Sequence, residues 1–202
     1  DQPRSRGLGD VYKRQVFMLS FNIFNIKIKI EYKIMAKEYG EMFLDSFLEL
    51  AKEKEYTKIS IVDLTERCSV SRQAFYYHYK SIDDMVIKNV NKEVNNICND
   101  INESDSWHDS ATKFIEAVEK YRFVIKSVLC SKKSLDAIDL LNKSTEKFIR
   151  AFIKSRHKED KFSDFLYTCC QYTFTGLIIS EMKNDSPNLM NILNKIDERI
   201  IK

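Results

Sequence analysis

The chain has 202 residues, of which 44% are hydrophobic and 31% charged, and its formal net charge at pH 7 is +3. Only 4 glycines and 2 prolines are present, which leaves few turn-forming residues and favours long helices. The mild charge neither supports nor excludes a nucleic-acid partner, so any DNA affinity must come from the positions of the lysine and arginine side chains. The odd number of cysteines, 5, lacks paired metal-ligand spacing and is typical of free thiols in a reducing cytoplasm.

Residues 1–34 differ in pattern from the rest of the chain. Residues 1–15 have no apolar period and resemble a translated sequencing-adapter remnant, while residues 26–34 alternate with the two-residue period of a strand. No small-residue cleavage site follows, and lysines interrupt any membrane span. We therefore expect a non-native or disordered leader before a natural start at Met35, and no membrane partner. An edge strand or a membrane-surface peptide is the alternative.

The next element is an amphipathic helix over residues 36–55. Phe43, Phe47, Leu50 and Ala51 recur on one face at helical spacing. This face predicts a helix that packs its apolar side against the segment that follows.

Two short helices separated by a tight turn are predicted within residues 57–81. Ser60 followed by Asp63 indicates a capped start, because the serine oxygen accepts an N-terminal N–H and the acid favours the positive end of the helix. Residues 68–70 form the turn, and Ser71 can cap the second helix. This is the layout of a helix-turn-helix, in which the second helix places its first residues against base edges in the major groove.

The same segment carries a family resemblance. Residues 70–80 read VSRQAFYYHYK and follow ISIVDL at residues 59–64, and together they resemble the DNA-binding signature of TetR-type transcriptional regulators. Residues 71–82 are especially similar to the subgroup of the dihydroxyacetone kinase regulator. The resemblance implies an all-α fold. An N-terminal three-helix helix-turn-helix domain with its linking helix would span residues 35–101, and an α-helical ligand-binding and dimerisation domain residues 102–202.

The side chains of the second helix divide by the side on which they lie. Val70, Phe75 and Tyr79 are spaced to face the first helix, so we expect them in the core. Arginine pairs with guanine, glutamine with adenine, and an alanine or tyrosine ring can contact a thymine methyl. We predict base contacts from Arg72, Gln73, Ala74 and Tyr76.

Other residues of the segment suit the DNA backbone. The hydroxyls of Thr57 and Ser60 and the ammonium of Lys58 precede a helix start, where a phosphate can be held. The resemblance implies backbone contacts from Tyr77, His78 and Lys80, with Ser71 completing the predicted DNA-binding set. For Tyr76 and Tyr77 packing is the alternative, and for His78 an ordinary surface position.

Residues 81–101 read as a long linking helix, capped by Ser81 and carrying acids in its first turn. In TetR-type regulators this helix joins the two halves and transmits ligand-driven movement to the reading heads. Many of them carry a lysine where this chain has Ile82. We expect that charge contact to be missing, with Lys80 as a substitute.

After a polar break at residues 102–106, helical patterns recur to the end of the chain. Helices are predicted near 106–119, 121–129, 132–156, 160–183 and 186–201. The last two resemble the four-helix dimer interface of the family and predict a homodimer through about residues 160–201, as symmetric half-sites require. Internal core is the alternative for both helices. Within them, Gly176 would permit close helix approach.

A ligand site is less sharply indicated than the DNA site. The resemblance implies a small-molecule effector in the C-terminal half, without fixing its identity or its pocket. Aromatic residues at helical spacing are more often core than pocket, and this half contains Trp107, Phe114, Tyr121, Phe123, Phe148, Phe152, Tyr167 and Tyr172.

An enzyme is not indicated. No cluster of acids, histidines or cysteines selects a metal or cofactor, so we predict none. The histidines His78, His108 and His157 have no partnered nucleophile, and no glycine-rich phosphate loop exists.

The sequence therefore predicts a cytoplasmic, homodimeric transcriptional regulator, in the simplest case a repressor. It would bind a palindromic operator in double-stranded DNA under the control of an effector. The alternative is a co-activator of the same fold that acts mainly through a partner protein, which the balanced charge and Ile82 permit.

Overall fold

A computed structural model of the chain describes residues 18, 22, 25–27, 29, 38–156, 164–184 and 189–195. The chain divides into two units, Asp1–Met42 and Phe43–Lys202. In the first unit Ile26, Lys27 and Lys29 are helical. These residues therefore do not form the strand that the alternation at 26–34 is typical of.

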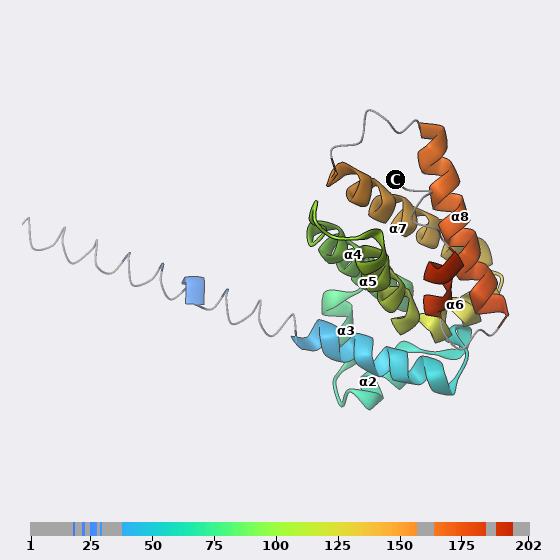
Figure 1. Ribbon diagram of the computed structural model, residues 1–202. Coiled ribbons are helices and arrows are strands. Elements are labelled where there is room, and N and C mark those ends of the chain that lie inside the picture. The colour runs from blue at the N-terminus through green and yellow to red at the C-terminus, as the bar shows by residue number, and fades with distance from the viewer. Residues whose placement is uncertain are drawn as a thin grey trace, which may run out of the picture. The chain divides into compact units, whose positions relative to one another are not determined.

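The second unit is built from helices (Figure 1). Residues 43–53 belong to a helix that is described from residue 38 onward. The elements that follow are η1 (Tyr56–Lys58), α2 (Ile61–Arg67), α3 (Arg72–His78), α4 (Ile82–Asn99), α5 (Trp107–Lys120), α6 (Arg122–Leu129), α7 (Ser134–Lys154), α8 (Asp164–Lys183) and η3 (Leu189–Lys195). The part of the chain that the structure describes contains no strand, and the predicted all-α fold is confirmed.

Aromatic side chains hold the helix-turn-helix against the helix at 43–53. The ring of Phe75 meets that of Phe43 edge to face at a centroid distance of 5.3 Å. Phe47 meets Tyr56 of η1 in the same way at 5.9 Å. Both phenylalanines of the first helix and Phe75 are fully buried, so the apolar face predicted from the sequence packs where expected.

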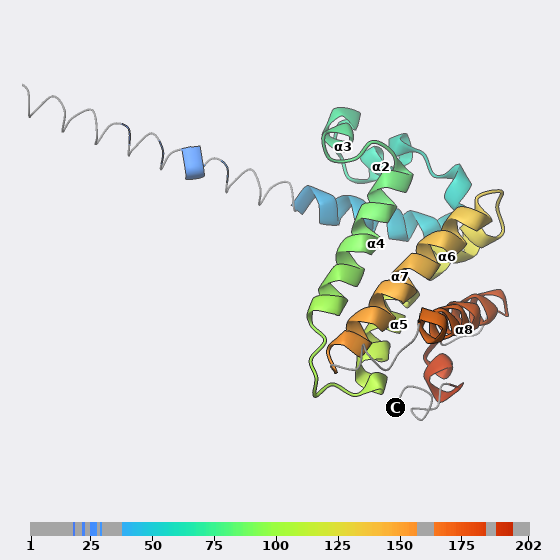
Figure 2. The ribbon, with the colours of Figure 1, turned by 90° about the horizontal axis from the view of Figure 1, so that it is seen from above.

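A second core lies among α5, α7, α8 and η3. Phe114 stacks on Phe148 at 4.8 Å, and Trp107 packs against Phe148 and Phe174. In Figure 2, α7 lies between α4 and α8, in agreement with its packing against both. Of the aromatic residues expected in the core, Phe123 and Tyr172 are instead exposed.

The C-terminal element differs from the helix predicted at 186–201. Its described residues form the 3-10 helix η3, in which Leu189 and Ile192 lie on one edge because side chains three residues apart eclipse one another. Leu189, Ile192 and Leu193 are buried against α5 and α8. The apolar residues of η3 therefore belong to the internal core, which was the alternative to a dimer surface for this element.

The polar break at residues 102–106 separates α4 from α5, but it does not divide the compact unit. Helix α4 packs on both α5 and α7. The proposed boundary at residue 102 therefore remains a prediction. None of the described helices is long and apolar enough to cross a lipid bilayer.

Candidate functional site

Helix α2 begins with the capping box that the sequence predicts. The Ser60 hydroxyl accepts a hydrogen bond from the backbone N–H of Asp63 at 3.2 Å, and the Asp63 carboxylate accepts one from the backbone N–H of Ser60 at 2.7 Å. The Lys54 ammonium lies 2.7 Å from the same carboxylate. Hydrogen bonds from Lys54 and Ser60 hold the pKa of Asp63 far below its usual range. The Ser60 hydroxyl is therefore engaged within the protein, whereas Thr57 and Lys58 are exposed.

The turn between the helices is closed by the backbone. The N–H of Val70 donates to the carbonyl of Thr65 and that of Ser69 to the carbonyl of Glu66, both at 3.0 Å. This pair of bonds is a Schellman motif, which needs a left-handed residue just past the helix. Ser69 supplies it with a φ of 55°. The turn at residues 68–70 thus reverses the chain without a glycine.

Helix α3 begins and packs as predicted. The Ser71 hydroxyl accepts from the backbone N–H of Ala74 at 3.2 Å and caps the helix. Phe75 and Tyr79 are buried, and Val70 is half-buried. Because this inward face is occupied by the core, the other side chains of α3 are directed away from it.

The outward residues of α3 are large and exposed. Arg72 and Gln73 lie in its first turn and are exposed, while Tyr76 and Tyr77 are exposed by 57% and 62%. Residues 72 and 73 share a side of the helix with 76, since positions three and four apart are neighbours. Ala74 is half-buried. Packing, the alternative for the tyrosines, does not account for rings left so open.

His78 and Lys80 lie at the C-terminal end of α3. His78 is half-buried, with its ring 6.4 Å from that of Phe43 and 5.1 Å from that of Tyr77. Burial lowers the pKa of His78 below its ordinary value, so the ring is neutral at pH 7. Lys80 is exposed and donates its backbone N–H to Asp84 at 2.9 Å.

Sequence reasoning missed Lys88, on the second turn of α4. Its ammonium pairs with Asp84 at 2.8 Å and lies 3.4 Å from the carbonyl oxygen of His78. This places a base beside the end of α3, where the expected lysine at position 82 is replaced by the half-buried Ile82. The helical spacing from Asp84 to Lys88 is the signal that could have revealed it.

The comparisons with known proteins agree with this geometry. The family model described as "Bacterial regulatory proteins, tetR family" matches residues 43–88, the stretch that carries η1, α2, α3 and the start of α4. Residues 43–88 are therefore similar to the helix-turn-helix domain of that family.

A solved structure has the same fold over most of the chain. It is named "Dihydroxyacetone kinase operon activator DhaS", with a TM-score of 0.67 and 14% sequence identity, and the likeness covers 80% of this chain and 93% of that one. At this identity the likeness shows a shared fold. No curated protein matches the sequence closely enough to count as a relative.

Tyr56 joins the helix-turn-helix to the C-terminal helices. Its backbone N–H donates to the hydroxyl of Ser127 on α6 at 2.8 Å, and its own hydroxyl donates to the carboxylate of Asp83 on α4. Lys133 pairs with Asp83 at 2.7 Å and lies over the Tyr56 ring. One buried tyrosine thus connects η1, α4, α6 and the residues just before α7.

The charge states at this junction follow from the contacts. Burial, and then the hydrogen bond to the Asp83 carboxylate, raise the pKa of Tyr56 far above its ordinary value. Burial alone would raise the pKa of Asp83, but Lys133 and Tyr56 outweigh it and leave that pKa lowered. At neutral pH the junction therefore holds a phenol, a carboxylate and an ammonium in mutual contact.

Next to this junction the C-terminal half encloses a cavity of about 550 Å³. Its walls are mostly aliphatic side chains of α4, α5, α6 and α7, and Tyr56, Asp83 and Lys133 belong to its lining. A cavity of this size is in the range that holds small organic ligands. Of the aromatic residues singled out in the sequence, Phe114 and Tyr121 line it.

Other kinds of site lack support in the described part of the chain. All five cysteines, Cys68, Cys98, Cys130, Cys169 and Cys170, are free thiols. Among the described residues no group of histidine, cysteine, aspartate and glutamate side chains is placed to hold a metal ion. The helix-turn-helix and the cavity are thus the two features that remain to be given a function.

Proposed function

We propose that the chain is a homodimeric transcriptional repressor in the cytoplasm that binds a palindromic operator through α3 and releases it when an effector enters the cavity. The observation that carries the DNA part is the outward face of α3. There Arg72, Gln73 and Tyr76 stand exposed beside each other, while Phe75 anchors the helix from behind. An α-helix presented in this way fits the major groove.

The predicted backbone contacts flank this face. Thr57 and Lys58 are exposed in η1, and Tyr77 and Lys80 are exposed at the other end of α3. The ammonium of Lys58 lies 3.1 Å from Glu55, but both side chains are largely exposed and such a pair is worth little in water. A DNA phosphate can therefore compete for Lys58. Ser60 and Ser71 support binding by fixing the helix starts, because their hydroxyls already accept from α2 and α3.

The dimer is proposed through α8. Phe165, Cys169, Tyr172, Gly176 and Ser180 recur at helical spacing, and all are exposed. A Cβ added at Gly176 would meet no atom within 4 Å. In the part of the chain that the structure describes, this apolar and small-residue face is exposed, so a second α8 could pack on it closely. Because η3 is buried in its own chain, the proposed contact is narrower than residues 160–201.

The dimer is tested by Gly176→Arg, which introduces a large charge at the proposed contact without a clash inside the chain. Light scattering after gel filtration should give a dimer for the parent chain and a monomer for the variant. Asn99→Arg, at an exposed position on α4, is the matched control and should remain a dimer. A parent chain that is monomeric at all concentrations rules out the proposed symmetric operator binding.

Effector control is supported by residues that the cavity and the junction share. Tyr56, Asp83 and Lys133 line the cavity and also hold η1 against α4 and α6. A ligand that displaced any of them would favour a different placement of the helix-turn-helix. Such coupling requires the ligand to bind the two placements with different affinity.

DNA binding is tested with labelled fragments from the chain's own promoter region and the neighbouring operon, titrated by fluorescence anisotropy at several salt concentrations. Arg72→Ala and Tyr76→Ala should each weaken specific binding by about 1–3 kcal/mol, which is the usual worth of a base contact. Arg67→Ala is the control, because Arg67 is an exposed base of α2 that pairs with Glu53 at 2.6 Å. If both α3 variants bind as the parent does, the proposed reading face is wrong.

A second function is favoured by exposed apolar side chains away from α8. Leu135 is 77% exposed at the start of α7, and Phe123 is 47% exposed on α6. These side chains suit a co-activator that works through a partner protein, and the structural relative is named as an operon activator. A promoter fusion separates the two functions, because deletion of a repressor raises expression and deletion of an activator lowers it.

A further inference from the structure

We propose that the cavity takes an uncharged, mainly aliphatic ligand whose single oxygen function pairs with the hydroxyl of Tyr121. This inference rests on the proposed effector control and names the chemical class of the effector. It is carried by three properties of the cavity: its aliphatic walls, one buried hydroxyl without a partner, and charges that are already neutralised by each other.

The walls are built from aliphatic side chains on every helix that bounds the cavity. The aliphatic lining residues are Val86, Ile87, Val90, Val94, Ala117, Val118, Val124, Ile125, Val128, Ala137, Leu140 and Leu141. Each methylene that a ligand buries against such a surface contributes about 0.8 kcal/mol. A ligand with an alkyl or alicyclic body therefore gains most of its affinity from these walls.

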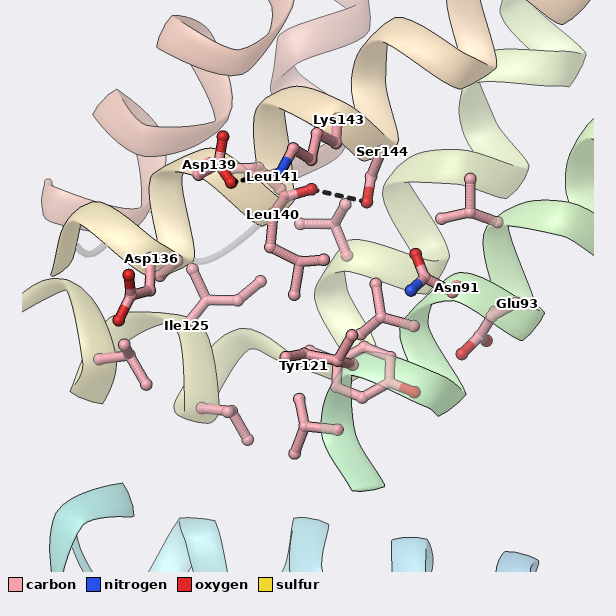
Figure 3. A pocket seen from close by; sticks show the side chains of 18 of the residues that line it. Asn91, Glu93, Tyr121, Ile125, Asp136, Asp139, Leu140, Leu141, Lys143 and Ser144 are labelled. Atoms are coloured by element: carbon pink, nitrogen blue, oxygen red, sulfur yellow. Dashed lines mark hydrogen bonds and ion pairs between the residues drawn. The ribbon is translucent and has the colours of Figure 1, made fainter. Parts of the chain in front are cut away.

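Tyr121 lies at the corner between α5 and α6 and lines the cavity. The residue is only 4% exposed, yet its hydroxyl makes no hydrogen bond of ordinary length and angle in the described structure, and the nearby Glu93 carboxylate is the one acceptor it faces. In Figure 3 its ring lies among the aliphatic side chains, with the hydroxyl directed toward the helix that carries Glu93. Buried polar groups are nearly always paired, so a hydroxyl left unpaired beside a cavity indicates a missing partner.

The phenol of Tyr121 is held in its protonated form. Burial, followed by the negative charge of Glu93 and by hydrogen bonding toward its carboxylate, raises the pKa of Tyr121 far above its ordinary value. It can therefore donate a hydrogen bond to a ligand oxygen over the whole physiological range. An alcohol or a ketone offers such an oxygen without bringing a charge.

The charged lining residues leave no room for a charged ligand. The two lining bases are already paired, Lys133 with Asp83 at 2.7 Å and Lys143 with Asp139 at 2.6 Å. Glu93 pairs with Lys120 at 3.3 Å. The one other lining acid, Asp136, is exposed in the first turn of α7, where the helix dipole stabilises it.

An anionic ligand would therefore find no free base in the lining that the structure describes. For a cationic ligand the one acid of that lining without an ion pair is Asp136, which is exposed and already in contact with water. An anion would also lie close to the carboxylate of Glu93. Burying a charge without a partner is costly, so both a carboxylate and an ammonium headgroup are disfavoured relative to a neutral one. The affinity of the cavity for a ligand should therefore depend more on the ligand's charge than on the shape of its hydrocarbon part.

The experiment is calorimetric titration of the full chain with four probes of equal chain length: decan-1-ol, decan-2-one, decanoate and decylammonium, each below its aggregation limit. The alcohol and the ketone should bind, and the two ions should bind at least tenfold more weakly. Tyr121→Phe should weaken the alcohol by about five- to tenfold, the usual effect of one hydrogen bond. Ser104→Ala, which removes an exposed hydroxyl from the loop between α4 and α5, is the control and should leave all four affinities unchanged.

A second measurement tests Tyr121 without any ligand. If its hydroxyl is unpaired in the free protein, Tyr121→Phe should leave the thermal midpoint unchanged or raise it. A clear loss of stability would show that the hydroxyl has an internal partner and would overturn the proposal. It is equally overturned if decanoate or decylammonium binds within threefold of decan-1-ol, or if neither neutral probe binds.

The outcomes separate this inference from the proposed function. If decan-1-ol binds through Tyr121 but leaves operator affinity unchanged, the ligand class stands and effector control by this cavity fails. If operator binding is normal and the ionic probes bind best, the ligand class fails and the DNA-binding function stands.

Discussion

The helix-turn-helix and the C-terminal half begin their helices in the same way but differ in how their interiors are filled. Both begin helices with serine caps. These are Ser60 and Ser71 in the helix-turn-helix and Ser106 in the C-terminal half. In the helix-turn-helix the interior is filled by aromatic rings that meet edge to face, and the residues with a proposed function point outward. In the C-terminal half the residues with a proposed function line a cavity between the helices.

This difference decides how each region can fail. A helix that reads DNA must be held rigidly, so its support is a filled core that tolerates little change. A helix bundle that admits a ligand keeps unfilled space, and gives up packing energy to do so. Substitutions at the two interiors should therefore have different costs even when the chemistry of the substitution is the same.

The largest expected effect is at the inner face of α3. Phe75→Ala removes a fully buried ring that contacts Phe43 and Tyr79, and should lower the free energy of unfolding by about 3–5 kcal/mol. Chemical denaturation measures it. Tyr77→Ala, two residues along the same helix but 62% exposed, is the control and should change stability by less than about 0.5 kcal/mol. Equal losses for the two variants would contradict the assigned sides of α3.

A matched pair of substitutions tests filled against unfilled space. Ala51→Leu enlarges a buried residue in the helix at 43–53, and overpacking there should cost about 1–3 kcal/mol. Ala117→Leu enlarges a half-buried residue in the cavity wall, where the added atoms can enter free space. It should leave stability nearly unchanged and weaken binding of decan-1-ol. If Ala117→Leu is the more destabilising change, the cavity is not available space.

Sequence reasoning predicted most of what depends on near neighbours in the chain. The caps at Ser60 and Ser71 follow from residues within one helical turn, and the inward position of Phe75 follows from spacing alone. The helix-turn-helix motif is equally local, which is why the resemblance to TetR-type regulators was visible in one stretch of sequence.

The remaining features depend on contacts between distant segments. The bridge from Tyr56 to Ser127 spans 71 residues, and no local pattern marks either end of it. Aliphatic residues that line the cavity have the same spacing as aliphatic residues of a filled core, so the cavity could not be predicted from periodicity. The 3-10 helix η3 likewise packs on α5, which is distant from it in the chain.

Ile82 offers a way to strengthen the DNA-binding region without touching the C-terminal half. Ile82→Lys places a base at the first residue of α4, where many TetR-type regulators carry one. If that position reaches a phosphate, the plot of log affinity against log salt should become steeper by about 0.9. Asn99→Lys, at an exposed position at the other end of α4, is the control and should leave the slope unchanged. An unchanged slope for both would mean that the N-terminus of α4 does not reach the DNA backbone.

The smallest expected effect concerns His78, and it separates the two regions by pH. In the free protein burial lowers the pKa of His78, so the ring is neutral at pH 7. A DNA phosphate nearby favours the charged ring, so the complex binds more protons than the free protein and affinity should rise as pH falls from 7.5 toward 6. The gain is limited to about tenfold for each unit by which the complex raises the pKa of His78.

The sign of the effect on folding is opposite, which makes the assignment testable. Because the pKa of His78 is lower in the folded chain than in the unfolded one, its contribution to stability is full above pH of about 6.5 and is lost as the pH falls toward the folded value. Weaker folding at low pH therefore cannot explain tighter operator binding. His78→Gln should abolish the gain in affinity, whereas His108→Gln, at an exposed position on α5, should retain it. If His108→Gln abolishes the gain instead, the proton is taken up in the C-terminal half and His78 does not contact the phosphate.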